Sequence, residues 1–103
     1  KPVVATGWSA NMDFMTAANS MPVRYELAPL AKTVGPYDPG PLWAEADVEH
    51  AAWCLCQLAE DADLATRIGA RAQESIRTKL DPLVIGRQVA DRLEVINRWH
   101  INN

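Results

Sequence analysis

The sequence lacks the two features that would tie it to a membrane or to nucleic acid. It has no apolar run of about 18 residues, the length at which a hydrophobic stretch is read as a membrane-spanning helix. It also lacks an excess of basic residues, with 10 Lys and Arg against 13 Asp and Glu and a net charge of −3. Because binding to a phosphate backbone depends on a basic patch, we expect neither a membrane span nor a nucleic-acid partner.

The sequence is also poor in cysteine and has no metal-binding motif. On a helix, Cys54 and Cys56 would point about 200° apart, too far apart to pair or to share a metal. We therefore interpret them as two small buried apolar residues in a reducing, cytoplasmic compartment. Asp38, Glu45 and Asp47 match no metal spacing either, and we expect a solvated loop that ends in a helix cap.

What the chain does have is the composition of a folded domain. It is 49% hydrophobic and 22% charged, which excludes an intrinsically disordered segment. Its 103 residues are enough for one domain or for part of one.

The first 15 residues organise the prediction. Val3 to Ala5 form a short apolar run before Gly7, which is typical of a strand buried on both faces of a parallel sheet. Such a strand needs neighbours on both sides, so we expect this chain to be the end of a larger domain. Residues 11–15 can form one helical turn, with Ser9 or Asn11 as its N-cap.

The middle of the chain is predicted to be extended. Met21 to Leu27 alternates as one half-exposed strand, with Val23, Tyr25 and Leu27 on the same side. Residues 28–42 are rich in Pro and Gly and predict a long series of turns. Trp43, which follows this stretch, is interpreted as a packing residue.

The rest of the chain predicts three helices, at about residues 48–59, 64–79 and 82–99. The first is capped by Asp47, the second by Asp61 or Asp63, and the third starts at Asp81-Pro82. The predicted buried positions of the first helix are Val48, Ala51, Ala52, Leu55 and Leu58. Trp53 is interpreted as a further packing residue. The predicted buried positions of the second helix are Leu64, Ile68, Ala72 and Ile76. The predicted buried positions of the third helix are Val89, Leu93 and Ile96.

Nearly the whole chain resembles a known family, most strongly over residues 1–15 and 43–80. The run KPVVATGWSANMDFM at residues 1–15 and the run GPYDPGPLWAEAD at residues 35–47 resemble segments of retaining, nucleotide-sugar-dependent glycosyltransferases of family 4, also called group 1. In that family, a PVVAT strand is followed by a turn and a short helix, and a Pro-rich loop returns to the body through a VWAEPD strand. The resemblance implies that Leu42 to Glu45 form that return strand here. Ala10 departs from the pattern, because a second glycine is usual there.

The resemblance implies a fold class and a place in that fold. The chain is similar to the C-terminal part of the donor-binding domain, the second of two Rossmann-like domains in a B-type fold. We therefore expect an α/β fold, a partial Rossmann-like domain with short strands followed by three C-terminal helices, over residues 1–103. The family's two donor-binding glutamates and its diphosphate-binding residues precede the PVVAT strand, so the resemblance assigns no catalytic residue to this chain.

The resemblance also implies what the intact protein does. It would transfer a sugar from a nucleotide-sugar donor to a glycan or lipid-linked acceptor in polysaccharide biosynthesis, and the chain alone would be inactive. Thr6, Gly7 and Ser9 lie at the carboxyl end of the first strand, where α/β sheets bind ligands, and they could form the edge of the nucleotide-sugar pocket. Gly7 could equally serve only the turn, and Ser9 only the helix cap. Trp8 could anchor this loop or lie in the cleft.

Two other classes of function stay open. The chain could be a non-catalytic α/β interaction module that docks a protein partner through its helices, or part of another nucleotide-binding Rossmann protein. Because the chain is expected to be cut from a larger domain, its open strand edge and uncovered apolar helix faces would favour self-association of the isolated chain.

Overall fold

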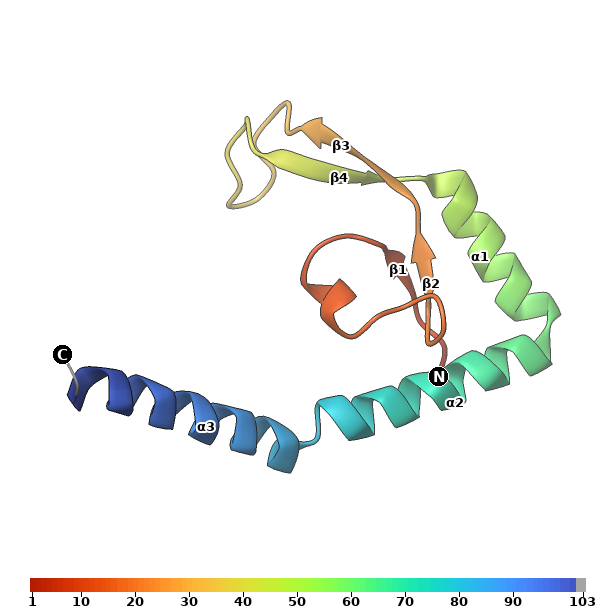
Figure 1. The fold of residues 1–103 in the computed structure, drawn as a ribbon. Coiled ribbons are helices and arrows are strands. Elements are labelled where there is room, and N and C mark those ends of the chain that lie inside the picture. The colour runs from red at the N-terminus through yellow and green to blue at the C-terminus, as the bar shows by residue number, and fades with distance from the viewer. Residues whose placement is uncertain (102–103) are drawn as a thin grey trace.

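The computed structural model describes residues 1–101, which form short strands followed by three helices (Figure 1). In chain order the elements are β1 (Val4–Thr6), a 3-10 turn η1 (Ala10–Asp13), β2 (Met21–Val23), β3 (Tyr25–Pro29), β4 (Leu42–Ala46), α1 (Val48–Glu60), α2 (Ala62–Lys79) and α3 (Pro82–Ile101). The fold is therefore mixed α/β and follows the predicted order, consistent with a partial Rossmann-like domain.

The first strand belongs to a parallel pair, as predicted. β1 pairs with β2 so that Val4 lies opposite Met21 and Thr6 opposite Val23, and η1 lies in the connection between the two strands. α1 packs against both strands. The prediction that β1 is buried on both faces is wrong, because Val4 and Thr6 are only half-buried. Among the described residues β1 has β2 as its one strand neighbour, which leaves its other edge open.

The predicted single strand from Met21 to Leu27 is instead two strands that belong to different sheets. β2 is parallel to β1, whereas β3 is antiparallel to β4. The break falls at Arg24, whose backbone N–H donates to Nδ1 of His50 and whose carbonyl accepts from the N–H of Asp47. Both backbone groups of Arg24 are thus turned towards the start of α1 and are not available to continue a sheet.

The Pro-rich segment forms the loop between β3 and β4, and the predicted return strand is confirmed as β4. The base of the loop is closed by two backbone hydrogen bonds, from Leu30 N–H to Pro41 and from Gly40 N–H to Leu30. Gly35 and Gly40 have positive φ angles of 56° and 113°, which glycine adopts without steric cost.

The three helices start where the sequence predicts. The carboxylates of Asp47, Asp61 and Asp81 each accept a hydrogen bond from a backbone N–H in the first turn of the next helix, at 2.8, 2.7 and 2.8 Å respectively. These bonds satisfy donors that a helix leaves without an internal partner. The caps therefore fix the starts of α1, α2 and α3, although α2 begins two residues earlier than its apolar pattern indicates.

The buried face of α1 differs from the predicted one. Val48 and Leu55 are 77% and 58% exposed, whereas Cys54 is 1% exposed. The helix turns the side that carries Ala51, Cys54 and Leu58 towards the rest of the molecule. Trp53 is 52% exposed, and its ring stacks on that of His50 on the same helix. Of the two cysteines, only Cys54 is buried as predicted, because Cys56 points to the opposite side and is exposed.

The second helix follows its predicted stripe for most of its length. Leu64, Ile68 and Ala72 are buried or half-buried, but Ile76 is 41% exposed. Gly69 is also buried, against the backbone of Lys1 and Pro2. α2 thus packs beside the start of the chain along its first half and leaves its second half open.

The molecule as a whole is open and curved (Figure 1). Its radius of gyration is 18.8 Å, against about 13 Å for a compact domain of this length. The buried apolar residues are few, and they lie where β2, the segment after η1, α1 and α2 meet: Met15, Val23, Cys54 and Ile68. α3 extends away from this core and none of its described residues is buried. Within residues 1–101 there is no helix whose length and apolar character would let it cross a membrane.

Candidate functional site

The turn after β1 is closed by hydrogen bonds to the Thr6 carbonyl. This oxygen accepts from the backbone N–H of Trp8 at 2.8 Å and from the side-chain amide of Asn11 at 2.9 Å. Of the two predicted N-caps of the short helix, Ser9 and Asn11, Asn11 is therefore not the cap of η1. Its side-chain amide instead links the 3-10 turn to the end of β1 through the hydrogen bond to Thr6.

Gly7 has a structural reason to be glycine. A Cβ at this position would lie 3.3 Å from Cβ of Pro22 and 3.3 Å from the carbonyl oxygen of Val23, which is tighter than ordinary packing. Its N–H, which could have faced a ligand, donates instead to the Val23 carbonyl at 2.9 Å. Gly7 thus lets the turn approach β2 closely, and its amide is already used within the chain.

Ser9 holds an unusual backbone conformation. Its φ and ψ angles are 72° and −153°, a region that is adopted almost only by glycine. Ser9 stands at the N-cap position of η1, where its carbonyl accepts from Met12 N–H, but its hydroxyl makes no capping bond. The side chain is exposed and stays available at the mouth of the turn.

The turn forms one wall of a cleft of about 360 Å³, and β4 forms the other. The cleft is lined by Thr6, Trp8, Ser9, Leu42, Trp43 and Ala44. Each of the two tryptophans also contacts a tyrosine ring. Trp8 packs on Tyr25 with ring centroids 5.4 Å apart, and Trp43 meets the edge of Tyr37 at the same distance.

Thr6 and Ser9 thus lie together at the predicted place, whereas the part played by β4 was not predicted. Trp43 was interpreted as a packing residue, yet it is 38% exposed and lines the cleft opposite Trp8. The sequence signal that could have found it is a tryptophan in the strand that follows a long Pro-rich loop.

The lining of the cleft decides what chemistry it can support. It offers two hydroxyl groups and two indole rings, and none of its six lining residues is ionisable. Hydroxyls exchange hydrogen bonds with neutral polar groups, and indole faces stack on planar or apolar ones. The cleft is therefore suited to hold a neutral moiety such as a nucleobase or a sugar ring, and it supplies no group that could transfer a proton.

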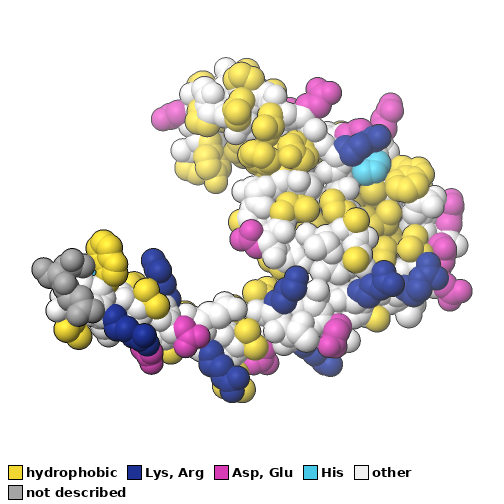
Figure 2. Space-filling view, viewed as in Figure 1, with side chains coloured by type: hydrophobic (Ala, Val, Ile, Leu, Met, Phe, Trp, Pro, Cys, Tyr) yellow, Lys and Arg dark blue, Asp and Glu magenta, His cyan; other side chains and the backbone are white. Residues whose placement is uncertain are grey.

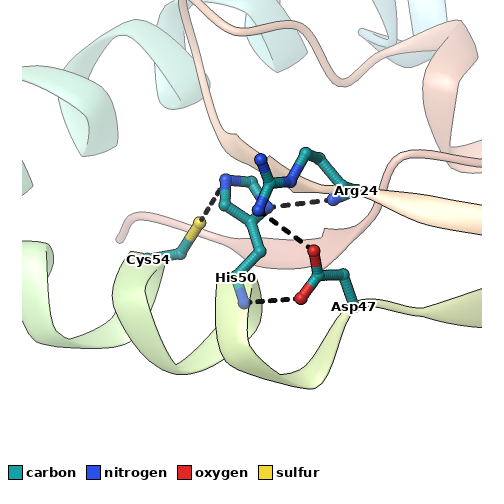
Figure 3. A network of polar contacts seen from close by, with 4 residues as sticks. All are labelled: Arg24, Asp47, His50 and Cys54. Atoms are coloured by element: carbon teal, nitrogen blue, oxygen red, sulfur yellow. Dashed lines mark hydrogen bonds and ion pairs between the residues drawn. The ribbon is translucent and has the colours of Figure 1, made fainter.

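A second polar cluster lies on the side of α1, made of Arg24, Asp47, His50 and Cys54 (Figure 3). The Asp47 carboxylate accepts from His50 N–H at 2.8 Å and from the Arg24 guanidinium at 3.0 Å. The hydrogen bond from the His50 backbone, assisted by the nearby Arg24 charge, holds the pKa of Asp47 below its usual value. The cluster fastens the break between β2 and β3 to the start of α1.

The same cluster places a histidine beside a cysteine, but not as a catalytic pair. Nδ1 of His50 accepts from Arg24 N–H at 3.0 Å, so the ring proton lies on Nε2, which faces Sγ of Cys54 at 3.8 Å. An Nε2 that carries the proton cannot take one from the thiol. Cys54 is also 1% exposed, which excludes a substrate from it.

No metal centre accompanies these sites in residues 1–101, where no three His, Cys, Asp or Glu side chains lie close enough to share an ion. Comparison of the chain with protein-family models, with curated proteins and with solved structures finds no match. The functional argument therefore depends on the cleft between the Thr6–Ser9 turn and β4.

Proposed function

We propose that the chain contributes part of the donor-binding site of a retaining glycosyltransferase, and that a nucleotide-sugar binds in the cleft between the Thr6–Ser9 turn and β4. The observation that carries the proposal is the position of this cleft beyond the carboxyl end of β1, a strand of a parallel pair with a helix against it. Ligands of open α/β sheets bind at such ends. The resemblance of residues 1–15 and 35–47 to the glycosyltransferase pattern supports the proposal independently.

In this proposal the chain binds the donor and does not perform the chemistry. The ring faces of Trp8 and Trp43 hold the planar or apolar side of the donor, and the hydroxyls of Thr6 and Ser9 hydrogen-bond its polar edge. Because none of the lining residues is an ionisable acid or base, and none could activate the hydroxyls of Thr6 or Ser9, transfer to a glycan or lipid-linked acceptor needs residues outside the cleft. The 103-residue chain alone is expected to bind donor without transferring sugar.

Titration of UDP, GDP, UDP-glucose and GDP-mannose into the chain, followed by calorimetry and tryptophan fluorescence, tests the proposal. We expect saturable binding of at least one of them, weakened roughly 5- to 150-fold in Trp43→Ala, since stacking on an aromatic ring contributes about 1–3 kcal/mol. Trp53→Ala is the matched control, because Trp53 is 52% exposed and lies outside the cleft. Absence of binding up to millimolar ligand, or equal loss in both variants, would contradict the proposal.

A specific observation favours a second candidate, a non-catalytic interaction module. Apolar side chains of α3, including Val89 and Leu93, are more than half exposed, as a surface that docks another protein would be. In this case no nucleotide or nucleotide-sugar binds, and the variants at Trp43 and Trp53 do not differ in the titration.

A further inference from the structure

One side of α3 is an apolar surface, which we call the α3 face. It consists of Ile85, Val89, Leu93 and Ile96, which recur every three or four residues and so lie on one side of the helix. They are 37%, 54%, 55% and 38% exposed. Most charged residues of the helix lie on the other side, where Glu94 and Arg98 form an i,i+4 ion pair at 3.0 Å, and Arg92 is the exception.

The described part of the chain leaves the α3 face uncovered. α3 adjoins the end of α2, from which it runs away from the core, and Figure 2 shows hydrophobic side chains at its surface. A helix of this length that packs only at its start on the preceding helix gains little stability from burial, because most helical stability in proteins comes from packing of the apolar face. The α3 face therefore needs a partner for the helix to persist.

The whole chain, of which the α3 face is one part, exposes more surface than a compact monomer of its mass would. The accessible surface is 8032 Å², whereas a compact monomer of 11.4 kDa exposes about 5,800 Å². The excess of roughly 2,200 Å² is about what each chain buries in an obligate dimer, whose interfaces total about 2,000–5,000 Å².

We propose that the α3 face is the centre of a homodimer interface, in which the α3 helices of two copies of this chain pack on each other about a two-fold axis. The four residues of the α3 face carry no charge, so two copies of it meet without burying an ion pair or an unpaired charge. Arg92 lies at the margin of the face, where its aliphatic stem covers the neighbouring apolar groups and its guanidinium stays in water. The proposal does not depend on the glycosyltransferase assignment.

Sedimentation equilibrium and light scattering of the chain, over a range of concentrations, test the proposal. We expect a mass twice the 11.4 kDa of one chain, and at least a tenfold rise in the dissociation constant for Leu93→Glu. Leu83→Glu is the matched control. It makes the same change on the same helix, at a residue that is 74% exposed and lies outside the α3 face, near the start of the helix.

Neither leucine is buried within its own chain, so both variants keep the core of the protomer intact, which circular dichroism checks. Three outcomes overturn the proposal: a monomer at every concentration, equal weakening by both variants, or association to higher oligomers that Leu93→Glu leaves unchanged. The last would point to pairing through the open edge of β1.

Discussion

Ser9 is a residue whose backbone conformation does not suit its side chain. Its φ of 72° and ψ of −153° lie in a region that costs a non-glycine residue about 1–3 kcal/mol. Replacing Ser9 by glycine removes that strain, while the extra freedom of glycine in the unfolded chain returns about 0.5–1 kcal/mol. We expect Ser9→Gly to raise the free energy of unfolding by about 1 kcal/mol in urea denaturation.

The control for this prediction is Ser9→Ala, which keeps the Cβ and removes only the hydroxyl. Since the hydroxyl makes no capping bond, the alanine variant is expected to unfold within about 0.5 kcal/mol of the wild type. A glycine variant no more stable than the alanine variant would mean that Ser9 is not strained. Strain kept at one serine on the wall of a cleft is the kind that binding sites retain.

The helices carry two glycines that the structure distinguishes. A Cβ at Gly86 in α3 would meet nothing within 4 Å, whereas a Cβ at Gly69 in α2 would lie 3.3 Å from backbone atoms of Lys1 and Pro2. Alanine is better than glycine within a helix by about 1 kcal/mol. We expect Gly86→Ala to gain roughly this amount in urea denaturation, and Gly69→Ala to gain nothing or to lose stability because the start of the chain must move.

Each glycine variant is the control for the other, because both changes are identical and both lie inside a helix. Equal stabilisation of the two variants would show that α2 does not pack closely on the start of the chain. The comparison therefore tests the contact between α2 and residues 1–2, which lead into β1.

The starts of the helices could be predicted from the sequence because they depend on local chemistry. An aspartate before a helix, or Asp81 followed by Pro82, acts through hydrogen bonds and φ angles within a few residues. The buried side of α1 could not be predicted, because it depends on which face meets β1 and β2. Counting apolar residues favoured Val48 and Leu55, whereas the actual contact is made by Cys54.

Strand patterns show the same limit. Residues 21–27 alternate as one strand would, but alternation does not encode that Arg24 turns its backbone to the cap of α1. In the candidate site, too, one wall could be predicted from neighbouring residues in the sequence, and the other wall could not. Thr6 and Ser9 follow from the strand-turn pattern, whereas Trp43 comes to them through a loop closure and sheet pairing that no local rule specifies.

The whole molecule has a small core and a large uncovered surface. The stability of these two parts should depend differently on protein concentration. Ile68 and Cys54 belong to a core formed within one chain, whereas α3 has no buried residue of its own. Association stabilises only the parts that it holds together. We therefore expect hydrogen exchange of the α3 amides to slow as protein concentration rises, in proportion to the dimer formed.

The amides of α1 supply the internal reference for this measurement. As long as they open by local fluctuation, their exchange should change less with concentration than that of α3. In Leu93→Glu the α3 amides should exchange rapidly at every concentration, whereas in Leu83→Glu they should follow the wild type. Amides of α3 that are equally protected at all concentrations, in the wild type and in both variants, would mean that the helix is stable without a partner. The excess surface would then need another explanation than a second copy of the chain.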